Sequence, residues 1–480
     1  MHASGSKEEH GLNTLNVENV EEGQPKEIFD AAQISSRSRS PAERALLRKL
    51  DWVVLPVLWL MYFLNFLDRA AITVARLNRM EKDLNLTSVQ YQACVSGLFV
   101  GYLLGQIPSN MIITRVRPSI FLGSWMALWA ICSTLQGIVH NFTGLFLARF
   151  FLGFTEAPFY PGALYLLSIF YTRTEIATRI SILFSGSVCG NAFASLIAIG
   201  VFKMHGVAGL AGWRWLYILQ GIITFVVAII SIFILPDEPS NTRWLSPDER
   251  ELAQSRVSGD TVARRTNTST WAGLKDAVTD QNLWPLILIQ HLGVAASGYK
   301  NFLPTVVQTL GYGQTTTLGM TCPPYLVSGA LSVLWSWSSG RRNERTWHLS
   351  MALTTAIIGF IIASATTNTG ARYFSIFVFT TGVYAISGIN LGWVASTCGQ
   401  TKEKRAVSLA VTNTISNIAT IYTPYWWPAS NGPRYVMPFT ISAVFLVVAA
   451  LSTFTLRWML VRANKKIRQT ESEAQVLYAL

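Results

Sequence analysis

The sequence predicts an all-α membrane protein with twelve transmembrane helices in two six-helix bundles. Half of its 480 residues are hydrophobic and 13% are charged, about half the charged share of an ordinary soluble domain. Apolar runs of about 20 residues, the length that spans a bilayer, follow one another almost from end to end. Short polar or basic turns separate them. A soluble protein buries one core and does not repeat such runs.

The apolar runs fall into two groups of six. The expected helices cover residues 52–72, 89–113, 119–139, 142–169, 179–202 and 213–235, then 283–306, 316–338, 348–367, 372–396, 405–427 and 435–460. The polar stretch between the groups opens with two prolines and two acids, which end a helix. The predicted parts are a disordered tail (1–50), a first bundle (51–235), a linker (236–282), a second bundle (283–461) and a second tail (462–480).

The placement of Lys and Arg predicts the orientation. With the N-terminus in the cytoplasm, the flanks on that side carry about 25 basic residues and the opposite flanks about seven, which follows the positive-inside rule. An even number of helices then puts both termini in the cytoplasm. This alternation accounts for the net charge of +12 without a basic groove for nucleic acid. The glycosylation sequons at Asn85 and Asn141 fall on the outer side.

Residues for catalysis or cofactors are not evident. The five cysteines are Cys94, Cys132, Cys189, Cys322 and Cys398. They are dispersed and lack CxxC spacing, so neither a disulfide framework nor a zinc site is expected. There is no P-loop, no GxSxG and no metal-ligand cluster, which argues against an enzyme, a cofactor and ATP-driven pumping. The N-terminal stretch has no early apolar segment of a signal peptide, so the first helix is expected to direct insertion.

Glycines recur at four-residue spacing in two of the expected helices. Gly97, Gly101 and Gly105 lie on one face of the second helix, and Gly186 and Gly190 on one face of the fifth. Small residues at this spacing let helix backbones approach each other in lipid. The pattern indicates either fixed helix packing or surfaces that slide, and the sequence does not separate the two.

Charged residues inside the apolar spans are the main functional candidates. Each costs roughly 2.5–3.5 kcal/mol at a helix centre, so each marks a pathway or an ion pair. They are Asp68 and Arg69 in the first helix, Arg149 and Glu156 in the fourth, and Lys300 in the seventh. An arginine fork fits a substrate carboxylate, and a glutamate in a low-dielectric cavity suits a proton carrier.

Helical geometry relates these candidates to one another. Arg149 and Glu156 are two turns apart, about 10 Å along one face, which suits two stations on one cavity wall. The alternative is that each pairs with a charge on a neighbouring helix, Arg69 and Asp68 included. Asp68 and Arg69 project about 100° apart, so we expect Arg69 in the cavity and Asp68 either in a cap or in function. Lys300 reaches either the interface or the solute.

Prolines and amides mark irregular helix. Pro158 and Pro161 must bend the fourth helix, which is tolerated at depth against protein or a water-lined cavity. Asn413 and Asn417 share a face of the eleventh helix and precede an aromatic run. They form either a wall of the solute site or contacts between helices. His291 is expected to be a hydrogen-bonded core histidine.

The run from Arg149 to Gly162, Arg-Phe-Phe-Leu-Gly-Phe-Thr-Glu-Ala-Pro-Phe-Tyr-Pro-Gly, resembles the fourth-helix signature of the fungal allantoate permease-type transporters. They form the anion:cation symporter family of the major facilitator superfamily. Runs that agree with this family are 62–69, 105–110, 114–118, 212–217, 235–239, 244–250 and 433–436. The resemblance covers about residues 50–465. One departure follows the eighth helix, where the family's Ser-Asp-Arg is replaced by Ser339-Gly340-Arg341.

The resemblance implies proton-coupled import of a small organic anion, such as nicotinate, pantothenate or allantoate, by alternating access. The family's charged positions map onto Arg69, Arg149 and Glu156. The sequence-based hypothesis is a monomer in the plasma membrane in which arginines hold the anion and Glu156, with Asp68, carries the proton. Lys300, Asn413 and Asn417 complete the expected solute site. The alternatives are a proton-driven exporter of drugs or metabolites and a nutrient sensor that does not transport.

Overall fold

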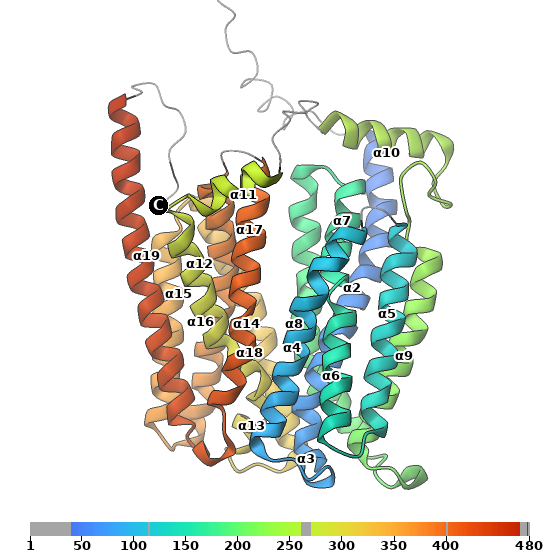
Figure 1. The fold of residues 1–480 in the computed structure, drawn as a ribbon, viewed down its shortest axis with the longest axis vertical. Coiled ribbons are helices and arrows are strands. Elements are labelled where there is room, and N and C mark those ends of the chain that lie inside the picture. Colours follow the sequence, from blue (N-terminus) through green and yellow to red (C-terminus); the bar gives the residue numbers. More distant parts are fainter. Residues whose placement is uncertain (1–39, 114–115, 261–269, 400–401, 471–477, 479–480) are drawn as a thin grey trace, which may run out of the picture. The chain divides into compact units, whose positions relative to one another are not determined.

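The computed structural model consists of helices joined by short connections (Figure 1). It describes residues 40–113, 116–260, 270–399, 402–470 and 478. Residues 49–480 pack together as one compact unit, and the charged residues of the apolar spans all lie within it.

Among the described residues, the first half holds eight α-helices and the linker two. They are α2 (Pro41–Leu77), α3 (Met80–Asp83), α4 (Ser88–Ile112), α5 (Pro118–Leu135), α6 (Phe142–Glu156), α7 (Phe159–Phe170), α8 (Arg173–Phe202) and α9 (Gly212–Ile234), then α10 (Pro247–Asp260) and α11 (Thr270–Val278). The second half contains α12 (Leu283–Ala296), α13 (Leu303–Gln308), α14 (Gln314–Arg342), α15 (Thr346–Ala365), α16 (Thr369–Thr397), α17 (Lys402–Asn417), α18 (Ala419–Tyr422) and α19 (Val436–Thr470).

Seven helical segments in the described part are long and apolar enough to cross a bilayer, judged by length and composition. They lie in α2, α5 with its 3₁₀ extension (Pro118–Ile138), α8, α9, α15, α16 and α19. The remaining predicted spans coincide with α4, α6–α7, α12–α13, α14 and α17–α18. These helices are either too short or not apolar enough to meet both criteria.

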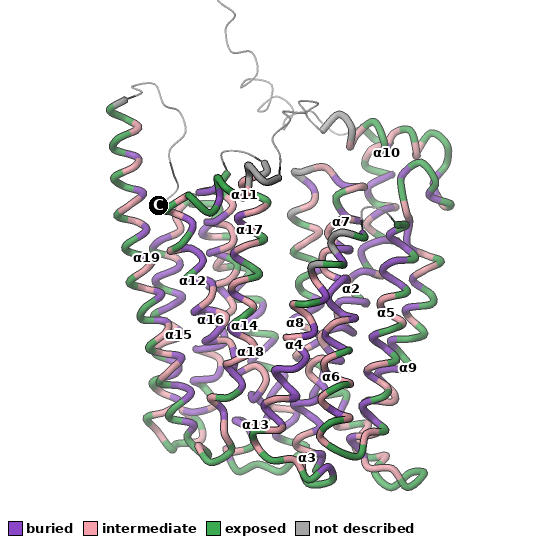
Figure 2. The backbone as a smooth tube through the Cα atoms, viewed as in Figure 1, coloured by how far each residue is buried: buried purple, intermediate pink, exposed green. Residues whose placement is uncertain are grey.

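The outer faces of these helices are themselves apolar. On α9, Ile223 is 53% and Phe233 69% exposed, and on α19 Leu451 is 63% exposed. Figure 2 shows exposed positions repeated along both helices. Apolar faces of this extent are not stable in water, so lipid must cover them. The structure thus supports the membrane prediction from the outside of the protein, independently of the sequence pattern.

Helix α2 corrects the predicted boundary of the N-terminal tail. Residues 41–50 were expected to be disordered, but the helix begins at Pro41. Ser40 and Glu43 cap it reciprocally, with the Glu43 N–H donating to Ser40 Oγ at 3.1 Å and the Ser40 N–H to Glu43 at 3.0 Å. Two satisfied N–H groups stabilise a helix start. The final helix likewise runs to Thr470, beyond its predicted end. The rest of the predicted N-terminal tail, 1–39, lies outside the described residues.

The linker also differs from the prediction of a polar loop, since α10 and α11 lie within it. Ser246 and Glu249 form a reciprocal cap at the start of α10, as a Ser-x-x-Glu spacing allows. Two ion pairs attach α10 to the first half: Lys49 to Glu249 and Arg256 to Glu175, both at 2.8 Å. The linker helix α10 is therefore held against the first half of the chain by ion pairs.

Some of the predicted spans are interrupted near a proline, while α4 and α14 continue through theirs. Helix α6 ends at Glu156 and α7 begins at Phe159, which confirms the predicted break around Pro158. The seventh span is divided in the same manner by a 3₁₀ segment, η4 (Ser297–Asn301), ahead of Pro304. In the eleventh span, η5 (Thr423–Trp426) contains Pro424. At each break, backbone N–H and C=O groups lose their partners within the helix.

The spaced glycines lie at helix contacts. A Cβ on Gly101 of α4 would collide with the Phe150 carbonyl of α6, and one on Gly153 would collide with the Leu98 carbonyl. On α8, a Cβ on Gly190 would lie 2.6 Å from the Phe63 carbonyl of α2. These glycines allow backbone contact, which is their packing role.

Gly101→Ala is therefore expected to lower the melting temperature of the purified protein, because forcing a methyl group into a packed contact costs about 1–3 kcal/mol. Gly319→Ala in α14 is the matched control, since a Cβ there meets nothing within 4 Å. Thermal unfolding in detergent measures both. Equal melting temperatures for the two variants would contradict the packing role of Gly101.

Candidate functional site

A buried ion pair joins α2 to the end of α6. Arg69 donates from Nε to the Glu156 carboxylate. The Arg69 side chain is 17% exposed and the Glu156 side chain is fully enclosed. The break at Pro158 places Glu156 at the end of a helix, beside a region where the backbone is irregular. The pair therefore has a partly exposed cation and a fully shielded anion.

Aromatic rings surround the guanidinium. The Arg69 Cζ atom lies 4.5 Å from the Tyr102 ring centre and 5.3 Å from the Phe66 ring centre. Tyr62 stacks on Phe159 and on Tyr160, with 5.7 Å between ring centres in both cases. Cation–π contacts of this kind hold an arginine without neutralising its charge. Tyr102 is therefore a residue of the site that the sequence did not single out.

Two buried polar atoms near the pair, Glu156 Oε1 and Asn65 Nδ2, make no well-formed hydrogen bond among the described residues, although the Asn65 amide lies close enough to the Glu156 carboxylate to interact with it. Buried polar atoms are nearly always satisfied, so this place has the capacity for a further polar ligand, water or a proton. Asn65 was missed in the sequence. Its spacing could have identified it, because it precedes Arg69 by four positions and shares its helix face.

Arg149 lies beside this pair but is more deeply buried than predicted. It is 2% exposed, so it does not line an open wall as expected. One guanidinium nitrogen is 3.5 Å from the Arg69 carbonyl oxygen, and Nε has no hydrogen-bond partner in the described part. Among the described residues it makes no ion pair. A buried guanidinium without an anion is costly, so an incoming carboxylate would have a ready partner.

Asp68 lies apart from Arg69, in the core between α2, α5 and α9. It is fully buried and accepts hydrogen bonds from Trp129 at 3.2 Å, Ser133 at 3.1 Å and Thr224 at 3.2 Å. All three donors are uncharged. The arrangement ties three helices together through one carboxylate that has no cationic partner in the described part.

In the second half, Lys300 lies in the 3₁₀ segment η4. Its Nζ is 4.0 Å from the ring centre of Tyr384 on α16, and its carbonyl oxygen accepts from Tyr325 at 3.3 Å. The described residues offer it no carboxylate within ion-pair distance. Lys300 is thus held against an aromatic face with its charge uncompensated, instead of extending to the interface.

The two predicted amides on α17 do not join the Arg69–Glu156 pair. Asn413 is exposed and Asn417 half-buried, and neither side chain is hydrogen-bonded to that pair. His291, by contrast, has partners for both ring nitrogens, the Ile415 carbonyl at 3.0 Å and the Tyr422 hydroxyl at 2.7 Å. This confirms the prediction of a hydrogen-bonded histidine.

The two halves pack on each other mainly through α8 and α14, and α4 also contacts α18 and η5. Further contacts lie toward α3 and α13, at the end opposite α10 and α11 (Figure 1). The Arg76 guanidinium lies 4.3 Å from the Tyr91 ring centre and 5.9 Å from that of Phe302. Phe302 stacks on Trp427 with ring centres 5.5 Å apart. Closer to the centre, Ser96 of α4 donates to the Ile421 carbonyl at 2.7 Å. Of these contacts, Arg76 with Phe302 and Ser96 with Ile421 join the two halves.

Comparison of the sequence with known proteins identifies a family. Residues 58–424 match the family described as the Major Facilitator Superfamily. An uncharacterized transporter of Schizosaccharomyces pombe, C1683.12, is 30% identical over 88% of this chain and 87% of its own length. The MFS-type transporter cnsO of Penicillium expansum is 30% identical, over 89% and 85%, and the major facilitator-type transporter hxnP of Emericella nidulans is 28% identical, over 96% and 94%.

Solved structures agree on the fold. A bacterial homologue of the human lysosomal transporter Spinster, in an inward-facing and unoccupied conformation, superposes with a TM-score of 0.71 over 88% of this chain and 99% of its own, at 18% identity. A D-xylose–proton symporter superposes with a TM-score of 0.66 over 84% and 97%, at 12% identity. The family match, the fungal relatives and the shared fold together make this chain a multi-pass membrane transporter, not an enzyme, and a member of the major facilitator superfamily.

Proposed function

We propose that the protein imports a small organic anion together with a proton by alternating access. The observation that carries this proposal is the Arg69–Glu156 ion pair with the unpaired Arg149 beside it. The proposal includes twelve membrane crossings, both termini in the cytoplasm, and action as a monomer in the plasma membrane. The resemblance of residues 149–162 to fungal anion:cation symporters supports an anionic solute.

The geometry supplies a coupling mechanism. In the ion pair, Glu156 occupies the guanidinium of Arg69, whose side chain is 17% exposed. A proton on Glu156 removes its charge and weakens the pair, because the attraction depends on both charges. Arg69 is then available to the carboxylate of the solute, which also meets the unpaired donors of Arg149. Proton and anion binding therefore favour each other through one shared guanidinium.

Charge counting leads to the same result. Two guanidiniums and one carboxylate give the empty site, formed by Arg69, Arg149 and Glu156, one positive charge. A monovalent anion alone cancels this charge, and a proton alone doubles it. Joint loading restores the charge of the empty site. The empty and the fully loaded forms therefore carry the same charge. The form that holds only the proton carries a second positive charge, which is expensive inside a membrane.

The other predicted residues take supporting roles in this proposal. Lys300 approaches the anion from the second half as the halves rearrange, with Tyr384 beneath its ammonium group. Asn413 and Asn417 provide polar contacts on α17. Asp68 acts as a second proton station behind Glu156, since uncharged donors surround its carboxylate. One solved structure with this fold is a D-xylose–proton symporter, so the fold is compatible with proton coupling.

Uptake of radiolabelled nicotinate, pantothenate, allantoate and biotin into cells that lack their own carriers tests the proposal. We expect one of these anions to accumulate, faster at acid than at neutral outside pH, because external protons load Glu156. Surface labelling confirms that the protein reaches the plasma membrane. Absence of uptake for every anion at normal surface expression would contradict import. Solute-driven proton efflux from inverted vesicles would then identify the exporter alternative.

A further inference from the structure

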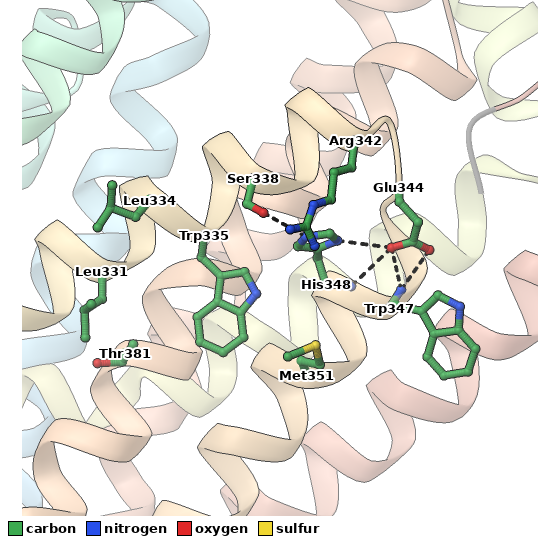
Figure 3. Close-up of a pocket in the computed structure, with 10 residues that line it drawn as sticks. All are labelled: Leu331, Leu334, Trp335, Ser338, Arg342, Glu344, Trp347, His348, Met351 and Thr381. Atoms are coloured by element: carbon green, nitrogen blue, oxygen red, sulfur yellow. Dashed lines mark hydrogen bonds and ion pairs between the residues drawn. The ribbon is translucent and has the colours of Figure 1, made fainter.

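A furrow lies between α14 and α15 in the second half of the chain (Figure 3). Both helices pack closely on α16 but scarcely on each other, which leaves a space of about 570 Å³. Leu331, Leu334 and Trp335 of α14 form one wall, Met351 of α15 the other, and Thr381 of α16 lies at the inner end. The furrow is therefore a gap in the protein's own packing.

The walls of the furrow are apolar and open to the outside. Leu334 is 60% and Met351 59% exposed, and Trp347 at the same helix end is 54% exposed. An apolar surface that the protein leaves uncovered calls for an apolar occupant. In a membrane protein, a hydrocarbon chain meets that requirement.

The linker-side end of the furrow is cationic. Arg342 is the last residue of α14, and its side chain extends over His348 at the end of the furrow (Figure 3). The described residues place no carboxylate within ion-pair distance of Arg342. The nearby Glu344 is already engaged, with His348 Nδ1 at 3.1 Å and Arg457 at 3.6 Å. The local acid is thus compensated while the guanidinium of Arg342 is not.

Along the furrow, apolar walls come first, then tryptophans, then the uncompensated Arg342. A phospholipid has the matching order of acyl chain, interfacial region and charged headgroup. Tryptophan belongs at the level of the headgroups, and basic pockets between helices on the cytoplasmic side suit anionic headgroups. The geometry points to a binding site for one anionic phospholipid of the cytoplasmic leaflet, with its phosphate on Arg342 and an acyl chain along Leu331, Leu334 and Met351. The inference rests on the proposed orientation but not on the transported solute.

Lipid binding to the purified, full-length protein tests this inference. The protein is placed in nanodiscs of phosphatidylcholine with or without phosphatidylserine, and retained lipid is counted by native mass spectrometry. We expect the wild type to retain one phosphatidylserine. Arg342→Gln should bind it about fivefold more weakly, the effect of one basic residue close to an anionic lipid. Met351→Trp, which fills the furrow, should reduce binding while Arg342 is intact.

Arg341→Gln is the matched control, because it removes the same charge one position away, where the guanidinium lies over Trp337. It should bind phosphatidylserine as the wild type does. Equal weakening by Arg341→Gln and Arg342→Gln would overturn the site in favour of general surface attraction. Equal binding of soluble glycerophosphoserine would also overturn it, since the acyl chain would then contribute nothing. Because the readout is bound lipid, failure here is distinct from failure of anion uptake.

Discussion

Glu156→Gln is expected to abolish accumulation of the solute against its gradient. A glutamine keeps the shape of the side chain but takes up no proton, so the solute loses its link to the pH gradient. In the wild type, one coupled proton contributes about 1.4 kcal/mol per pH unit, which supports about tenfold accumulation. The variant should exchange the solute across the membrane but not concentrate it. Accumulation in membrane vesicles with an imposed pH gradient measures the difference.

Two comparisons make this expectation decisive. Exchange of labelled for unlabelled solute needs no net proton movement, so Glu156→Gln should retain it and thereby show that it folds. Glu249→Gln is the matched control, because Glu249 of α10 is also a glutamate in an ion pair, with Lys49. This variant should accumulate solute normally. Gradient-driven accumulation by Glu156→Gln at wild-type level would exclude Glu156 as the proton carrier.

Glu156→Gln also leaves Arg69 without its anion. Breaking a buried pair from one side costs about 3–5 kcal/mol, so a lower melting temperature is expected for the single variant. Replacing Arg69 by Gln as well removes both charges and should recover part of the lost stability. The double variant should still fail to accumulate solute, because the proton carrier and the shared guanidinium are both absent.

Arg149→Ala should remove most of the binding affinity for the anion. The guanidinium is buried and its Nε lacks a partner in the described structure, so it is free to bind the solute's carboxylate. Truncating one member of a buried charge pair costs about 2–5 kcal/mol, at least about a thirtyfold increase in Kd. Arg149→Lys should be intermediate, because an ammonium keeps the charge but not the planar fork. Equilibrium binding of labelled solute to purified protein measures Kd.

Arg372→Ala provides the matched control for Arg149. Arg372 is also a buried arginine, but protein acceptors occupy its donors, Thr309 Oγ1 at 2.8 Å and the Pro433 carbonyl at 2.6 Å. Its loss should lower stability and leave Kd unchanged. Lys300→Gln should raise Kd less than Arg149→Ala, since Lys300 is half-buried and rests on Tyr384. An unchanged Kd for Arg149→Ala would remove that residue from the solute site.

Local features of the chain were predictable because they depend on neighbouring residues alone. Pro158 removes a backbone hydrogen bond from its helix whatever that helix packs against, so an irregularity between α6 and α7 followed from the sequence. The reciprocal caps at Ser40 and Ser246 could also have been read from their spacing to Glu43 and Glu249. They were missed because polar stretches were interpreted as tail and loop. Helices begin at such caps even where the residues that follow are hydrophilic.

The sequence by itself determined that the chain is a helical membrane protein, which charges lie within its apolar spans, and that Asp68 and Arg69 diverge. Only the tertiary structure decided that Glu156 pairs with Arg69, 87 positions away. It also decided that Arg149 is buried with no anion beside it among the described residues, and that Asn65 lies near Glu156. Periodicity fixes the face of a helix on which a side chain lies, but not the rotation of that helix against its neighbours. That rotation follows from close contacts such as Gly101 against Phe150, which the whole packed assembly sets.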